Sequence, residues 1–92
     1  MPHFKIEFSF KGVDYTAHVH KVEHAGEIHP AHYQVRNVRP EIPGLPDTYS
    51  FFYEVYGQQF SFPPFNHSNE LPEKMLSAIK KYCAKHNLSF VL

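Results

Sequence analysis

The start of the chain alternates between apolar and polar side chains, and this alternation constrains the fold more than any other feature. The apolar positions are Phe4, Ile6, Phe8 and Phe10, and each residue between them is polar or charged. A period of two residues is typical of a strand that buries one face. The sequence therefore predicts a strand over residues 3–10 whose apolar face covers a core.

Lys11 and Gly12 form a predicted two-residue turn after this strand. Glycine tolerates a positive φ angle, and turns of this kind match the twist of paired strands. A second strand over residues 13–22 then places every apolar residue on one face, and a slip of one residue would destroy the match. The predicted apolar pairs are Phe10 with Val13, Phe8 with Tyr15, Ile6 with Ala17, and Phe4 with Val19.

Three further strands follow the first hairpin in the sequence. We expect them over residues 32–38, 48–56 and 59–62, because each segment alternates or is rich in aromatic and β-branched residues. Residues 39–47 hold three prolines and one glycine, which predicts an extended surface loop. A predicted two-residue turn at Gly57 and Gln58 would pair Val55 with Phe60, Tyr53 with Phe62, Phe52 with Pro63, and Tyr56 with Gln59.

One amphipathic helix is predicted over residues 70–86. Pro72 fits only the first turn of a helix, and Asn87 is suited to end the helix in a left-handed conformation. The apolar residues of this segment recur at helical spacing and form one stripe, which consists of Leu71, Met75, Ala78, Ile79, Tyr82 and Cys83.

These elements predict one α+β domain over residues 1–92. The length fits a single domain, and short connections favour a meander in which consecutive strands are neighbours. The helix packs on the aromatic face of a five-stranded antiparallel sheet. The apolar segment 88–92 either packs on the domain as a tail or adds a sixth short strand.

Composition excludes several classes of function. Nine Lys and Arg residues balance nine Asp and Glu residues, so the sequence lacks the concentrated basic stripe that nucleic-acid binding needs. The first residues contain no continuous apolar run, so we expect neither a signal peptide nor a membrane span. Cys83 is the only cysteine, which rules out an internal disulfide framework. We therefore expect a cytoplasmic protein.

The most unusual feature of the composition is the presence of eight histidines. The predicted hairpin places His18 and His20 on its polar face and puts His3 opposite His20, so three imidazoles converge on a candidate zinc site. Lys5 sits opposite His18, and its ammonium group would repel a metal. The alternatives are therefore three solvated histidines, with no cofactor, or a weak metal- or pH-responsive site.

The sequence contains no motif that predicts an enzyme. Cys83 and His86 are three residues apart on the helix, but Cys83 lies on the buried stripe and no third catalytic group accompanies them. We interpret Arg36 and Arg39 as ordinary surface residues on a neutral protein. We expect a small non-enzymatic domain.

An apolar patch is predicted on the polar side of the sheet. Phe52 and Tyr56 point away from the helix, and the predicted turn places Pro63 beside Phe52. Either the tail of residues 90–92 or Phe65 covers this patch, or it is an interface, because monomers seldom expose large apolar areas. The leading hypothesis is a protein-interaction module or a homodimer that uses Phe52, Tyr56 and Pro63.

Overall fold

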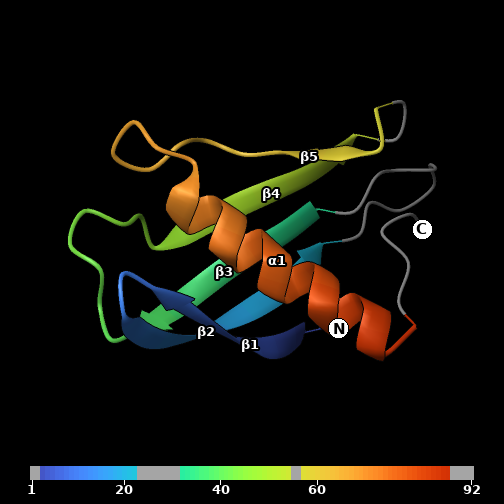
Figure 1. Cartoon of the computed structure of the whole chain (residues 1–92). Helices are drawn as coiled ribbons and strands as arrows, with labels where there is room; N and C mark the ends of the chain where they lie inside the picture. The colour runs from blue at the N-terminus through green and yellow to red at the C-terminus, as the bar shows by residue number, and fades with distance from the viewer. Residues whose placement is uncertain (1–2, 23–31, 55–56, 88–92) are drawn as a thin grey trace.

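The computed structural model describes residues 3–22, 32–54 and 57–87, and it confirms the α+β class (Figure 1). Five antiparallel strands form one sheet in the order β1-β2-β3-β4-β5, so the predicted meander is correct. One helix follows the sheet. The elements are β1 (His3–Phe10), β2 (Val13–Val22), β3 (His32–Arg39), β4 (Thr48–Glu54), β5 (Gln59–Ser61) and α1 (Glu70–Lys85).

The first hairpin has the predicted register. Phe10 pairs with Val13, and the pairing continues without interruption to His3 opposite His20. The turn residues Lys11 and Gly12 have φ angles of 51° and 78°. Positive φ at both positions is the geometry that joins twisted strands without splaying them.

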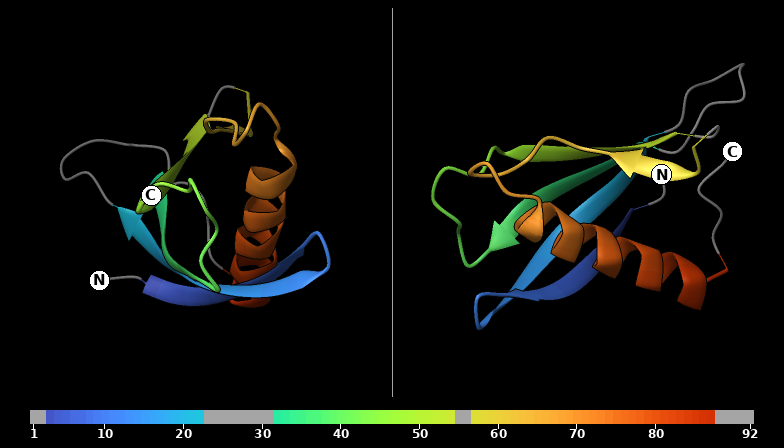
Figure 2. Two further views of the ribbon diagram at one scale, coloured as in Figure 1. Left: turned by 90° about the vertical axis from the view of Figure 1, so that its left-hand side faces the viewer. Right: turned by 45° about the horizontal axis from the view of Figure 1, so that its top comes forward.

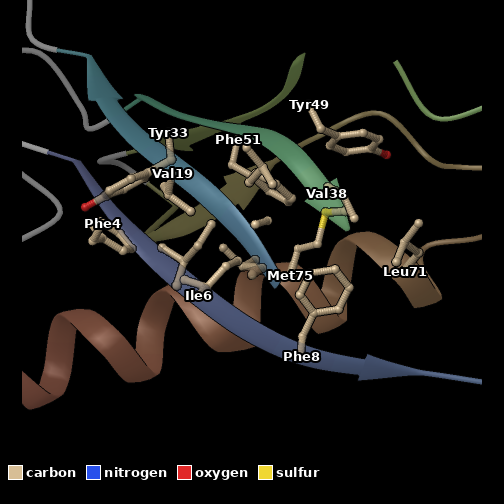
Figure 3. Close-up of a cluster of buried hydrophobic side chains, with 14 of the residues drawn as sticks. Phe4, Ile6, Phe8, Val19, Tyr33, Val38, Tyr49, Phe51, Leu71 and Met75 are labelled. Carbon is tan, nitrogen blue, oxygen red and sulfur yellow. The ribbon is translucent and has the colours of Figure 1, made fainter. Parts of the chain in front are cut away.

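Helix α1 covers one face of the sheet, and the sheet curls around it (Figure 2). Phe4 of β1 stacks on Tyr82 of α1, with ring centroids 3.9 Å apart and planes 3° from parallel. Such an aromatic pair contributes about 0.5–1.5 kcal/mol beyond the area that it buries. The hydrophobic core between sheet and helix (Figure 3) consists of Phe4, Ile6, Phe8, Ala17, Val19, Tyr33, Val35, Val38, Tyr49, Phe51, Leu71, Met75, Leu76, Ile79 and Cys83.

A β-bulge in β3 was not predicted. Asn37 and Val38 together lie opposite Ala17, because the β2–β3 register shifts at this point. Asn37 has a φ angle of 54°, and asparagine tolerates this left-handed conformation better than most residues. The extra residue reverses the alternation, so Asn37 is exposed and Val38 joins the core.

The predicted register of the last hairpin was wrong by two residues. Tyr53 pairs with Phe60 instead of Phe62, and Phe52 pairs with Ser61 instead of Pro63. The predicted turn needs positive φ at both of its residues, but in this segment only Gln58 has it, with a φ angle of 51°. A slip of two residues keeps every side chain on its face, so the apolar pattern does not distinguish the two registers.

The element boundaries differ slightly from the predictions. β3 extends to Arg39, β4 is described to Glu54, β5 ends at Ser61, and the helix ends at Lys85. Asn87 has a φ angle of 53°, which confirms the predicted left-handed residue after the helix. The tail at 88–92, and with it the predicted sixth strand, lies outside the described residues. Within the described segments, no helix is both long and apolar enough to cross a membrane.

The bulge generates a stability prediction at Asn37. Replacing Asn37 with Val should lower the free energy of unfolding by about 1–2 kcal/mol, because a β-branched side chain is strained at positive φ. Asn37→Gly should be nearly neutral, because glycine adopts this conformation without strain. Urea unfolding of the two variants beside the wild type measures both effects. Equal losses in both variants would argue against a left-handed residue at this position.

Candidate functional site

The sheet curls around the helix, so its face opposite the helix is convex (Figure 2). Two rows of paired residues run across this face from β1 to β4. Directly paired residues on neighbouring strands project on the same side of a sheet, with Cβ atoms about 5 Å apart. The first row runs through Lys5, His18, Arg36 and Thr48. The second row runs through His3, His20, Gln34 and Ser50.

The structure brings the three predicted histidines together. The ring of His3 lies 5.1 Å from that of His20 and 6.0 Å from that of His18, measured between centroids. Both ring pairs are stacked, with planes 20° from parallel. The predicted proximity, which followed from the register of the first hairpin alone, is therefore present.

The stacked arrangement does not place the three imidazoles as metal ligands. The lone pair of an imidazole nitrogen lies in the plane of the ring, so rings that face each other direct their lone pairs side by side. A zinc ion needs nitrogen atoms that converge on one point at about 2.0–2.1 Å. Among the described residues, no group of three His, Cys, Asp or Glu side chains is placed to hold a metal ion. Zinc binding would require these rings to turn.

His20 sits in an electrostatically unfavourable position for a cation. Partial burial in the sheet lowers its pKa from the ordinary value, and the neighbouring Arg36, His3 and His18 lower it further. Both causes act on the protonated imidazole, because burial removes water from a charge and like charges repel it. The neutral form of His20 therefore fits this part of the sheet best.

Arg36 lies in this cluster, whereas the sequence analysis treated it as an ordinary surface residue. It occupies the same row as Lys5 and His18, and its Nη2 donates a hydrogen bond of 2.7 Å to Oε1 of Gln34. Its place in this cluster depends on the β2–β3 register, which no short turn sets.

Phe52 lies on the same convex face, one row beyond His20 and Gln34. Its side chain is 48% exposed, and its ring stacks on His32 of β3 with centroids 4.1 Å apart. Pro63 is exposed but does not pair with Phe52, because of the corrected register. Tyr56, the third predicted interface residue, lies outside the described residues.

The sulfur of Cys83 is fully buried, and its neighbour is a tyrosine. Its Sγ lies 3.6 Å from the hydroxyl oxygen of Tyr33, while the ring of His86 stacks on Tyr82. Burial raises the pKa of Tyr33 well above its ordinary value, and the contact with Cys83 raises it further. Cys83 and Tyr33 therefore belong to the core.

A hollow lies beneath the loop of residues 37–47. The backbone turns at Ile42–Leu45, where the N–H of Leu45 donates to the carbonyl of Ile42 at 3.1 Å and Gly44 has a φ angle of 82°. Proline followed by a positive-φ glycine is the pattern of a type II turn. The charged side chains of this lining are Arg39, Glu41 and Asp47. They offer ionic contacts but neither a hydroxyl nor a thiol nucleophile.

No protein-family model, no curated protein and no solved structure matches this chain. The fold and the surface define its class: a small α+β domain whose antiparallel meander is covered by a helix on one face. Its other face carries the histidine cluster and Phe52. Any proposal about function must therefore come from that face.

The lowered pKa of His20 predicts acid sensitivity. An unfolded chain protonates histidine near pH 6.5, whereas folded His20 takes up a proton only at lower pH. Stability from neutral His20 is therefore present above about pH 6.5 and is lost as the pH falls through the folded pKa. Replacing His20 with Gln should make the drop in the urea midpoint between pH 7.5 and 5.5 smaller.

His67→Asn is the matched control for this experiment. His67 is an exposed histidine in the turn before α1, with a φ angle of 59° that asparagine tolerates. The control should keep the full acid-induced drop in the urea midpoint. A drop in His20→Gln as large as in the wild type would show that His20 does not cause the acid sensitivity.

Proposed function

We propose that this chain is a small non-enzymatic interaction module that self-associates through the convex face of its sheet. The observation that carries the proposal is Phe52, a large aromatic side chain that is 48% exposed on the face without a helix. Its stacked partner His32 presents a second flat ring beside it. Aromatic side chains of this kind are enriched at the centres of protein interfaces.

A second copy of the chain is the partner that the charge balance favours. The net charge is zero with histidine neutral, and the calculated isoelectric point is about 7.1. Two copies therefore repel each other least near neutral pH. Histidine takes up protons in mild acid, which adds positive charge to a chain with eight histidines, so two copies would then repel each other. We therefore expect association near pH 7 that weakens at pH 5.5.

Replacing Phe52 with Ser tests this interface. Loss of a central aromatic contact should weaken dimerisation by at least about tenfold. Sedimentation equilibrium over a wide concentration range at pH 7 measures the change. Val13→Ser is the matched control, because Val13 is also a large exposed hydrophobic residue, 40% exposed, but lies at the first hairpin turn. The control should associate as the wild type does.

Two results would contradict self-association through this face. The first is a wild type that stays monomeric at the highest concentration at pH 7. The second is equal weakening in Phe52→Ser and Val13→Ser, which would indicate a general effect of lost apolar surface.

A second candidate function is a metal- or proton-responsive binding protein that uses His3, His18 and His20. The observation that favours it is the contact of three imidazole rings on one exposed face. Zinc is the metal suited to imidazole ligands in a small site. Lys5 and Arg36 in the same cluster oppose a cation, which makes the proton-responsive version the stronger one.

The zinc version predicts a thermal shift that depends on His20. Free zinc at ten times its dissociation constant should stabilise the wild type by about 1.4 kcal/mol. His20→Ala should abolish this shift, while the control His67→Asn should retain it. Differential scanning calorimetry with and without micromolar zinc measures both. A shift in His20→Ala equal to that of the wild type would remove these three residues as the ligands.

A further inference from the structure

The side chains of the two rows on the convex face are enriched in basic groups. Of the eight paired positions, five are basic, three carry neutral hydroxyl or amide groups, and none is a carboxylate. The whole chain has nine acidic residues, as many as Lys and Arg together. Lys, Arg and His together make up 17 of the 92 residues, so five of them at eight positions are a local enrichment.

The basic rows disfavour a proton on His20. Burial lowers the pKa of His20 most, and Arg36, His3 and His18 lower it further. Lys5, His18 and Arg36 occupy directly paired positions of neighbouring strands. The core lies on the other face and makes no use of these groups. A bound anion would offset the repulsion between these basic groups and would therefore stabilise the folded protein.

We infer that these two rows form a binding site for a ligand with two or more linked phosphate groups, and that binding tightens in mild acid. The site, which we call the basic patch, consists of His3, Lys5, His18, His20, Gln34, Arg36, Thr48 and Ser50.

The donors of the basic patch match phosphate chemistry. Arg36 presents a planar fork of N–H groups that suits phosphate oxygens, and its bond to Gln34 uses one donor and orients the rest. Lys5 adds a point charge, and Thr48 and Ser50 add hydroxyl donors at the end of each row.

The size of the basic patch favours a small ligand. Neighbouring strands lie about 4.8 Å apart, so the basic groups of β1, β2 and β3 span roughly 10 Å. That span fits a chain of two or three phosphates. A nucleic acid would need a longer basic stripe.

The surroundings of His20 give the site its dependence on pH. The acidic residue nearest to the basic patch on β1 is Glu7, which lies beyond Lys5 on the side away from His20. Each imidazole that takes up a proton therefore adds positive charge to the basic patch, and a bound phosphate chain favours that protonation. The titratable and charged groups nearest to His20 on the convex face are His3 and Lys5 from β1, His18 from β2, and His32 and Arg36 from β3.

This inference rests on the proton-responsive function proposed above and not on self-association. The Phe52→Ser protein separates the two, because Phe52 lies outside the basic patch. At concentrations where both proteins are monomeric, that variant should bind the phosphate ligand as the wild type does.

The test is a titration of the ¹⁵N-labelled protein with inorganic triphosphate, followed by NMR at pH 7.5 and pH 5.5. Amide shifts should concentrate at the basic patch, and the dissociation constant should fall about tenfold or more from pH 7.5 to 5.5. Lys5→Gln/Arg36→Gln should weaken binding at pH 5.5 by about tenfold. His18→Gln/His20→Gln should abolish most of the pH dependence of binding. Comparing this variant with the wild type at each pH cancels the contribution from protonation of triphosphate itself.

The matched control is Lys74→Gln/Lys81→Gln, which removes two charges from exposed positions of α1. It should bind triphosphate within about twofold of the wild type. Equal weakening in the helix control and in Lys5→Gln/Arg36→Gln would overturn the proposal, because it would show attraction by net charge alone. Tighter binding of a hexaglutamate peptide than of triphosphate at the same amides would overturn the assignment to phosphate.

Discussion

The turn at Lys11 and Gly12 is the constraint on which both faces of the sheet depend. Positive φ at both residues closes the hairpin with a fixed register. That register directs Phe4, Ile6 and Phe8 toward the helix. Because side chains alternate, it also directs the polar residues between them to the convex face. The core and the histidine cluster therefore follow from one local geometry.

The two faces of the sheet contribute differently to the stability of the fold. The concave face holds the apolar residues that pack against α1, including the stack of Phe4 on Tyr82. The convex face contributes little burial, and its basic groups disfavour a proton on His20. Neutral polar residues would satisfy the sheet equally well. The basic cluster is therefore better explained by a ligand than by the requirements of the fold.

The sequence predicted those features that a single local pattern determines. A one-residue slip in the first hairpin would bury Lys5 and Glu7, so its register was predictable. In the last hairpin, a two-residue slip preserves both faces, and the pattern therefore could not locate the pairing of Tyr53 with Phe60. The bulge at Asn37 depends on backbone conformation rather than on hydrophobic spacing, and it escaped prediction for that reason.

The same distinction separates the predicted part of the site from the part that was missed. His3, His18 and His20 belong to one hairpin with a short turn, so their proximity was predictable. Arg36 lies on β3, which residues 23–31 link to β2, and no two-residue turn sets that register. Sequence alone therefore suggested a cation site from three histidines. The added guanidinium of Arg36 reverses the sign of the ligand that the cluster favours.

Protons and phosphate should act on the convex face in opposite directions. Protonation of histidine in mild acid adds positive charge to the chain, which repels a second copy and at the same time strengthens the attraction for an anion. A bound phosphate chain neutralises the basic patch and removes the repulsion between copies. Because Phe52 lies just beyond the row of His20, a ligand on the basic patch leaves that ring exposed. The two proposed activities are thus coupled through charge rather than through competition for the same atoms.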